Sequence, residues 1–292
     1  MSGCATSPVI LSILITNTML TMNQQDPPNR VPPPETPAQG DDAGLTRPSP
    51  LLLRDQLYAE PLPERGLFSF NEAVASVFPD MISRSVPGYT TVIAMTGVLA
   101  ARHARPNTTI YDLGCSLGAS LLSVAKEPAC QNCELIGIDN SDAMLTAARS
   151  HLAQFPEGKL ITLEIGDIAD VALDNASVVI MNYTLQFVPI AQREAVLTRI
   201  RKALMPGDLL ILSEKITLQD NELNRHLIDL HHDFKRQQGY SDLEIAQKRD
   251  ALENVLLPET REAHFNRLKR AGFSQCDVWF QCLNFASFIA IA

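Results

Sequence analysis

The sequence is poor in several residue types, and each shortage excludes a class of protein. Its 292 residues include only six cysteines, too few for the dense framework of a small disulfide-bonded secreted domain, so a reducing compartment such as the cytoplasm is expected. Its 24 basic residues are outnumbered by 33 acidic ones, which gives a formal net charge of -9. Because proteins that cover nucleic-acid phosphates need clustered Lys and Arg, no direct nucleic-acid binding is expected. The expected partner is a small molecule.

Long hydrophobic runs are also missing. The apolar stretch from Val9 to Ile15 is far shorter than the ~20 residues that a membrane-spanning helix needs, and Thr16 interrupts it. No membrane association is therefore expected. The first 22 residues contain no Lys or Arg, so they lack the positively charged start of a secretory signal, and export is not expected either.

Large apolar residues are scarce in the N-terminal region. Between Asp26 and Pro50 the chain is dense in Pro, with Gly, Asp and Gln. Such a composition buries too little apolar surface to offset its ordering entropy. We therefore expect residues 1–50 to form a disordered extension and residues 51–292 to form one folded domain. Met19 and Met22 lie just upstream of this tract and leave a later translation start open.

The folded part begins with helical patterns and continues with strand-like ones. From Asn71, apolar residues recur at three- and four-residue spacing until Pro87, and a second helix is predicted from Thr90 to about His103. Five short apolar runs then alternate with helical segments. These runs are residues 110–113, 135–138, 160–165, 178–181 and 209–212. Continuous apolar runs of this length are typical of strands buried on both faces of a parallel sheet, and the β-α-β order predicts a doubly wound one.

The C-terminal runs change the type of fold that is expected. Residues 277–282 and 285–291 are joined too tightly for a helical crossover, so they predict an antiparallel hairpin at the edge of the sheet. This ending is typical of class I methyltransferase folds rather than of dehydrogenases. The predicted class is therefore α/β: a Rossmann-like class I methyltransferase fold with a mostly parallel sheet, an antiparallel C-terminal hairpin, N-terminal helices and an inserted helical pair.

The inserted helices occupy about residues 220–256. The first carries Leu223, Leu227, Leu230 and Phe234 along one face. The second begins at Ser241, which forms a capping box with Glu244 in which each side chain satisfies a free backbone N–H of the first turn.

The sharpest local signal is the segment IYDLGCSLG from Ile110 to Gly118, a strand that runs through a turn of small residues into a helix. Glycine lets a backbone approach a ligand closely, because no Cβ intervenes and positive φ is allowed. The spacing differs from the dinucleotide fingerprint, since Ser116 stands where its second Gly would be, and it fits the looser acidic-x-Gly-x-Gly loop of S-adenosylmethionine enzymes better. Taken alone, it also fits an ordinary strand-to-helix connection.

Polar residues end three successive strands beside this turn. They are Asp139 and Asn140 after the second strand, Asp167 with Ile168 after the third, and Asn182 after the fourth. Asp139 is suited to accept both ribose hydroxyls of a nucleoside. The alternative is that Asp139, Asn140 and Ser141 only cap the following helix, and both roles are compatible. Together with the glycine turn, these residues predict a nucleoside-binding site.

Two pairs of residues of a kind that can bind metals are not interpreted as metal ligands. Cys130 and Cys133 have zinc-type spacing, but no second pair completes four ligands. His231 and His232 are adjacent on a helix and point to different faces, so a surface or packing role is expected. No metal is assigned.

With these residues in place, the chain closely resembles the carboxy-S-adenosyl-L-methionine synthase family over about residues 53–291. The shared blocks are VFPDMISRSVPGY from Val77, YDLGCSLGA from Tyr111, TLQF from Thr184, LSEK from Leu212, HHDFKR from His231 and GYSDLEIAQKR from Gly239 to Arg249. Ordinary methyltransferases share the glycine loop but not the other blocks. The first fifty residues have no counterpart in the family.

The resemblance implies a homodimeric, S-adenosylmethionine-binding catalytic domain over residues 51–292. It would convert S-adenosylmethionine and prephenate to carboxy-S-adenosylmethionine and phenylpyruvate, and so supply a second enzyme that modifies the wobble uridine of tRNA. The implied ligand contacts are Tyr89, Gly114, Cys115, Ser116, Asp139, Asn140, Asp167, Ile168, Asn182 and Arg249. Tyr89 and Arg249 are the implied catalytic residues, and Arg249 would reach into the neighbouring subunit's site. The alternatives are an ordinary methyltransferase and, more distantly, a non-catalytic nucleoside-binding module.

Overall fold

The computed structural model of the protein describes residues 53–61 and 67–292. The extension expected over residues 1–50 lies outside the described residues. Within the described part of the chain, no helix is long and apolar enough to cross a membrane.

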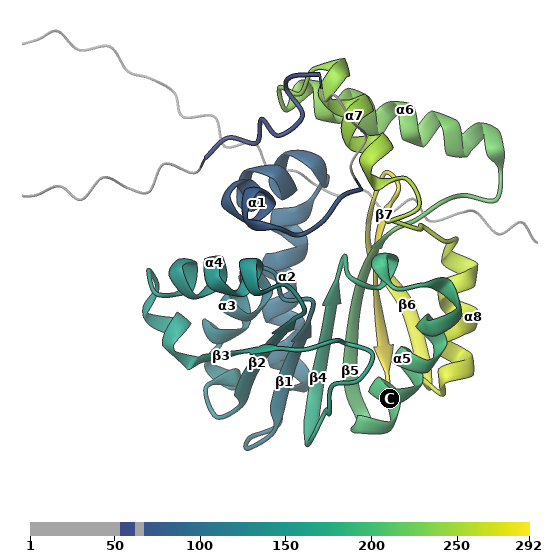
Figure 1. The fold of residues 1–292 in the computed structure, drawn as a ribbon. Coiled ribbons are helices and arrows are strands. Elements are labelled where there is room, and N and C mark those ends of the chain that lie inside the picture. The colour runs from purple at the N-terminus through teal and green to yellow at the C-terminus, as the bar shows by residue number, and fades with distance from the viewer. Residues whose placement is uncertain (1–52, 62–66) are drawn as a thin grey trace, which may run out of the picture. The chain divides into compact units, whose positions relative to one another are not determined.

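A seven-stranded sheet in the order β3-β2-β1-β4-β5-β7-β6 forms the centre of the fold (Figure 1). Its strands are β1 (Thr109–Leu113), β2 (Glu134–Asp139), β3 (Ile161–Ile165), β4 (Ala176–Asn182), β5 (Leu204–Lys215), β6 (Gln275–Cys282) and β7 (Phe285–Ile291). The first five strands pair in parallel, and β7 runs antiparallel to both β5 and β6. The predicted fold class is confirmed. One strand is longer than its apolar run indicated, since β5 continues to Lys215 at the rim of the sheet.

Helices cover both faces of the sheet. They are α1 (Glu72–Ser85), α2 (Tyr89–His103), α3 (Ala119–Ala125), α4 (Asp142–Leu152), α5 (Ile190–Ala203), α6 (Asn221–Gln237), α7 (Asp242–Leu252) and α8 (Arg261–Ala271). In Figure 1, α1, α6 and α7 lie above the sheet, on the side to which the arrowhead of β4 points. These three helices therefore stand over the carboxyl ends of the parallel strands, where ligands of open α/β sheets bind.

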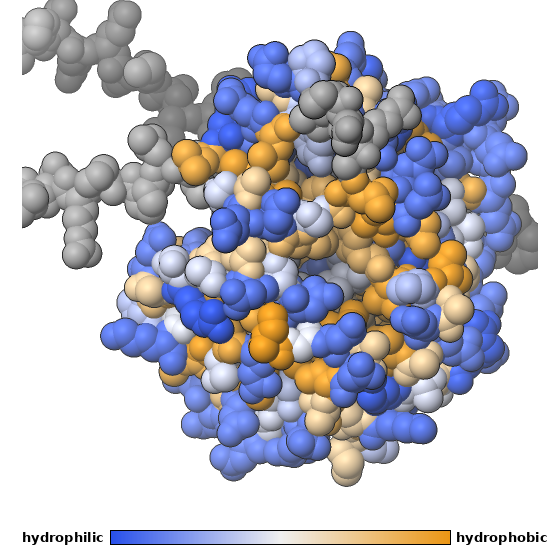
Figure 2. All heavy atoms as spheres, viewed as in Figure 1, coloured by the Kyte–Doolittle hydropathy of each residue, from blue (hydrophilic) through white to orange (hydrophobic). Residues whose placement is uncertain are grey.

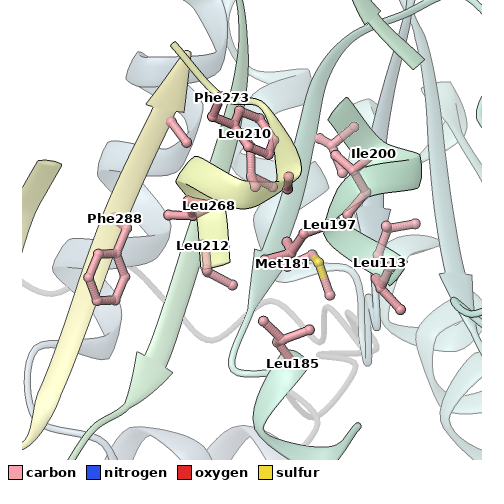
Figure 3. Packing of buried hydrophobic residues seen from close by; sticks show 14 of the residues in the cluster. Leu113, Met181, Leu185, Leu197, Ile200, Leu210, Leu212, Leu268, Phe273 and Phe288 are labelled. Carbon is pink, nitrogen blue, oxygen red and sulfur yellow. The ribbon is translucent and has the colours of Figure 1, made fainter. Parts of the chain in front are cut away.

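Successive side chains of a strand point to opposite faces of the sheet, so the apolar residues form two layers, one on each face. In β1, Ile110 packs with Leu121 of α3, whereas its neighbour Tyr111 packs with the cluster that contains Leu197 of α5. Figure 3 shows the second layer, in which Leu197 and Leu268 of α8 meet residues of β4, β5 and β7. Each fully buried leucine contributes about 1.5–3 kcal/mol relative to an exposed one. The central strands β1 and β4 are buried along almost their whole length because both faces are covered, whereas the edge strands β3 and β6 are partly exposed.

The inserted helices begin where the sequence predicts, and α6 does not bury its apolar stripe as its main contact with the protein. The capping box of Ser241 and Glu244 is confirmed. The apolar stripe of α6 is only partly buried, since Leu223 and Leu230 are 57% and 37% exposed and the other two members are half-buried. The buried residues of this helix are His231 and Lys235. The α6 helix thus turns a polar side toward the protein, where the His231 ring nitrogen Nε2 lies 2.8 Å from the Ser85 carbonyl oxygen.

A fully buried arginine fixes the loops beside the carboxyl end of β4. Arg193 of α5 donates hydrogen bonds to the carbonyl oxygens of Gln186, Val188 and Leu257, at 2.9–3.0 Å, and to the Glu259 carboxylate at 2.5 Å. One side chain therefore ties the segment after β4 to the segment after α7. Losing one partner of a buried pair of this kind typically costs about 3–5 kcal/mol, because the other charge is left unpaired.

A second buried charge nearby has an incomplete set of partners. The Glu214 side chain is fully buried; Oε1 accepts the Leu185 amide at 2.9 Å, and Oε2 has no hydrogen-bond partner among the described residues. Burial raises the pKa of Glu214 to about 8, against the opposing effects of Arg193 and backbone amides.

This raised pKa predicts a pH-dependent stability. Because folding favours protonated Glu214, its contribution is complete below the ordinary glutamate pKa of about 4.3 and is lost as pH rises toward 8. We expect Glu214→Gln to keep the Leu185 bond and to flatten the fall of the unfolding free energy between pH 5 and pH 8, measured by urea denaturation. Glu164→Gln, at an exposed glutamate, is the control. If the unfolding free energies of wild type and Glu214→Gln change in parallel with pH, the raised pKa of Glu214 is contradicted.

Candidate active site

A cavity of about 1160 Å³ lies where the helices α1, α6 and α7 face the carboxyl ends of the strands. Figure 2 shows a hollow in the middle of the corresponding face, bordered by apolar residues. All ten ligand-contact residues expected from the sequence line this one cavity: Tyr89, Gly114, Cys115, Ser116, Asp139, Asn140, Asp167, Ile168, Asn182 and Arg249. Residues up to 160 positions apart in the chain are thus brought to one cavity, and their contacts with a ligand stay a prediction.

The glycine turn has the backbone that its sequence indicates. Gly114 and Gly118 have φ angles of 78° and 80°, and Ser116 between them has a φ of 50°. A Cβ on Gly114 would lie 2.4 Å from the Thr184 side chain. Glycine is needed at 114 for its positive φ and for this close approach of the loop that follows β4.

Asp139 organises both sides of the turn. Its two carboxylate oxygens accept the backbone N–H groups of Ser116, at 2.9 Å, and of Ser141, at 3.0 Å. The helix cap itself is Ser141, whose hydroxyl accepts the Met144 amide at 3.1 Å. The helix cap is therefore Ser141, and the role of Asp139 toward a ribose stays a prediction.

A second carboxylate lies deeper at the same end of the cavity. Asp112 is 2% exposed, and its pKa is raised to about 8 by burial and then by the negative charge of Asp139. Burial also raises the pKa of the Tyr89 hydroxyl, with a further contribution from Asp112. This end of the cavity favours a positively charged ligand, because a nearby cation would stabilise the ionised form of Asp112.

The end of β4 is held by side chains and carries a strained residue. The Asn182 amide donates to Thr96 and Ser120, at 3.3 and 3.0 Å, and its oxygen accepts from Ser213 at 2.7 Å. The next residue, Tyr183, is buried with a φ of 63°, which is uncommon for a bulky residue. Such strain is found where the surrounding structure fixes a functional geometry.

The remaining expected contacts lie at the cavity's margins. Asp167 is exposed and accepts the Ala169 amide at 2.8 Å, and the Ile168 carbonyl accepts a hydrogen bond from Arg199. Arg249 lines the cavity of its own chain, with its side chain 63% exposed and 3.0 Å from the Asp250 carboxylate.

Sequence reasoning missed an aromatic row in the cavity wall. The rings of Tyr89 and Tyr183 are 6.2 Å apart, those of Tyr183 and Phe285 are 6.2 Å apart, and those of Phe285 and His231 are 5.0 Å apart. These residues come from α2, the end of β4, β7 and α6. Because they are far apart in the sequence, no local sequence pattern predicts that their rings meet. His231 and His232 both line the cavity. His231 has the packing role that the sequence suggested, since its ring contacts Phe285 and its Nε2 lies 2.8 Å from the Ser85 carbonyl oxygen.

Cations also reach this cavity. Lys215, Lys235 and Lys248 belong to its wall, and none was singled out from the sequence. Within the described ranges, no group of three or more His, Cys, Asp or Glu side chains is arranged to hold a metal ion.

Known proteins share both the site motif and the fold. A family model described as a methyltransferase domain matches residues 110–207. The human N-acetylserotonin methyltransferase, solved in complex with S-adenosylmethionine, has a TM-score of 0.52 at 16% identity over 75% of this chain and 55% of that one. The fold, with its glycine turn below the cavity, defines a class I methyltransferase-type protein.

Sequence identity to curated relatives shows to which family within this class the chain belongs. Carboxy-S-adenosyl-L-methionine synthase of Pseudoalteromonas translucida is 51% identical over 241 residues, which cover 82% of this chain and 100% of that protein. The synthase of Yersinia enterocolitica is 49% identical over 238 residues, 82% of this chain and 90% of that one. The chain belongs to the carboxy-S-adenosyl-L-methionine synthase family and is an enzyme of that kind.

The close packing at Gly114 predicts that a larger residue at this position destabilises the protein. Gly114→Ala should lower the unfolding free energy by about 2–4 kcal/mol, because it combines a positive φ with a clash against Thr184. Gly207→Ala is the matched control, since Gly207 has a φ of 93° and open space around it, so it carries the φ cost alone. Adding Thr184→Ala should restore only the part of the unfolding free energy that the clash removes. Equal losses at 114 and 207 in denaturant titrations would show that the loop can move aside.

Proposed function

We propose that the enzyme converts S-adenosylmethionine and prephenate to carboxy-S-adenosylmethionine, phenylpyruvate and water. The product would supply the carboxymethyl donor for wobble uridine modification of tRNA, a step carried out in the cytoplasm by a second enzyme. The observation that carries this proposal is the gathering of all ten expected contact residues on one cavity, in a chain about half identical to named synthases. The net charge of -9 agrees with an enzyme that does not bind tRNA itself.

The cavity suits the chemistry of a sulfonium substrate. A sulfonium polarises its methyl group, so loss of a methyl proton gives a stabilised ylide whose carbon takes up the carboxyl group released from prephenate. We propose that the departing prephenate hydroxyl takes this proton and leaves as water, which balances the reaction without a protein base. Asp112 and Asp139 would favour the cationic substrate at one end of the cavity. Tyr89, whose hydroxyl pKa is raised by burial, would stay neutral and contact the sulfonium or the new carboxylate.

Association into a homodimer is part of the proposal. Its support is the exposed apolar stripe of α6, in which Leu223 and Leu230 are 57% and 37% exposed, together with Leu243 of α7 at 40%. Arg249 lies on the same pair of helices with a largely exposed side chain. An arginine so placed can extend toward a neighbouring subunit, where its fork would bind a carboxylate through two parallel N–H bonds.

The reaction itself can be tested by the nucleoside that accompanies the protein. We expect mass spectrometry of the purified enzyme, incubated with S-adenosylmethionine and prephenate, to detect carboxy-S-adenosylmethionine and phenylpyruvate in equal amounts. An ordinary methyltransferase would instead leave S-adenosylhomocysteine. A purely binding protein would return S-adenosylmethionine unchanged.

Arg249 provides the test of selectivity. The product differs from its precursor by one carboxylate, so Arg249→Met should weaken binding of the carboxylated nucleoside by about 1.5–3 kcal/mol and binding of S-adenosylmethionine much less, as measured by calorimetry. Arg225→Met, at an exposed arginine of α6, is the control. Mixing Arg249→Met with Gly114→Ala subunits should restore one working site if the arginine crosses the interface. Equal weakening for both nucleosides would contradict the selectivity.

A further inference from the structure

The cavity has a cationic end opposite its carboxylates. Lys215 ends β5, Lys235 lies on α6 and Lys248 on α7, and the two helical lysines are 7% and 6% exposed. The aromatic row leads from Tyr89, beside Asp112, to His231 at this end. One cavity therefore joins an acidic and a basic region through a wall of rings.

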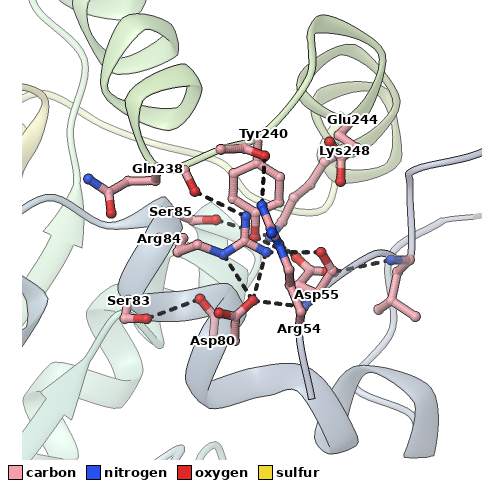
Figure 4. Close-up of polar contacts among 12 residues, drawn as sticks. Arg54, Asp55, Asp80, Ser83, Arg84, Ser85, Gln238, Tyr240, Glu244 and Lys248 are labelled. Atoms are coloured by element: carbon pink, nitrogen blue, oxygen red, sulfur yellow. Dashed lines mark hydrogen bonds and ion pairs between the residues drawn. The ribbon is translucent and has the colours of Figure 1, made fainter. Parts of the chain in front are cut away.

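Not all cations near this end are equivalent. Lys248 lies 3.6 Å from the Asp55 carboxylate and 3.2 Å from the Ser85 hydroxyl. Asp55 also accepts the Tyr240 hydroxyl at 2.6 Å. Arg84 is paired with Asp80 at 2.6 Å (Figure 4). These two cations are consequently neutralised within the protein and belong to its framework.

Lys215 and Lys235 lack such neutralisation. Among the residues that the structure describes, neither ammonium has a hydrogen bond or an ion pair. Each lies near an aromatic ring, with the Phe285 ring 6.0 Å from Lys215 and the Tyr240 ring 5.3 Å from Lys235. Burial lowers the pKa of both lysines, and the nearby charges of Lys248 and Lys215 help to lower that of Lys235 to about 7, against the weaker opposing effect of Asp55 and Glu244. Lys235 is buried and Lys215 is half-buried. A cation shielded from water without a partner is costly, so a protein retains such lysines where a ligand supplies the anions.

We propose that Lys215 and Lys235 bind the two carboxylates of the second substrate, an organic diacid whose ring packs along the Tyr183 and Phe285 rings. This inference rests on the proposed function, and it assigns the residues of the acid's binding site. A diacid fits better than a monoacid because there are two unpaired ammonium groups. The sulfonium would lie at the acidic end and the diacid at the basic end, so each substrate is directed to its own half of the cavity by charge.

The test compares stability with substrate binding in the full-length enzyme. Lys215→Met and Lys235→Met should each raise the KM for prephenate at least tenfold, with a smaller change in kcat and unchanged affinity for S-adenosylmethionine. Because each removes an unpaired charge that is buried at Lys235 and half-buried at Lys215, both variants should melt at the same temperature as the ligand-free wild type or higher. Lys248→Met should instead melt lower, since it leaves Asp55 unpaired. Lys269→Met, at an exposed lysine, is the neutral control, and Lys235→Arg should restore part of the lost affinity.

A binding measurement separates this inference from the proposed reaction. Phthalate, an unreactive cyclic diacid, should bind the wild type in the presence of S-adenosylmethionine and bind each Met variant at least tenfold more weakly. If the wild type forms no carboxylated product but shows this difference, the reaction is wrong and the diacid site stands. If folded Met variants keep the wild-type KM for prephenate and the wild-type affinity for phthalate, the two lysines do not form the site.

Discussion

Burial of charge away from water is the constraint on which this structure depends. A charge in a largely dry interior needs a partner, and the molecule meets this need in two ways. In the framework, partners belong to the chain: Arg193 donates to three carbonyls and to Glu259, and Arg84 pairs with Asp80. In the cavity, Asp112 and the pair Lys215 and Lys235 lack an opposite charge in contact with them within the described chain. The first group holds the walls in place, and the second leaves them prepared for ligands.

This division explains why the site is built at the rim of the sheet. The carboxyl ends of β1, β2 and β4 supply backbone and carboxylate groups at fixed spacing, because the strands are locked by covered apolar layers. The helices α1, α6 and α7 supply the opposite wall. Preorganised polar groups of this kind need little rearrangement when a charged substrate enters. The strained backbone of Tyr183 fits the same interpretation, since Tyr183 links the strand end to the aromatic row.

Much of this arrangement was readable from the sequence because it depends on local patterns. Apolar runs gave the strands, the Pro87 and Gly88 break separated the first helices, and Ser241 with Glu244 marked the start of α7. The glycine turn and the strand-end residues placed one wall of the cavity. On the opposite wall only Arg249 was expected, from the family resemblance. The helical lysines there were missed, because a lysine on a helix has the same local pattern whether it faces solvent or a cavity. The buried side of α6 could not be predicted from its apolar stripe, since the helix turns His231 and Lys235 inward.

The position of β7 has a consequence for how the protein comes into being. This strand is the last in the sequence, yet it lies between β5 and β6, and its first residue, Phe285, pairs with Lys215 in the sheet. Until the final residues have been synthesised, β5 has an open edge and the aromatic row lacks one of its rings. A nascent chain released early would expose that edge to other strands, a recognised route to aggregation. The pairing of β7 with β5 is thus required before Phe285 can complete the aromatic row of the cavity.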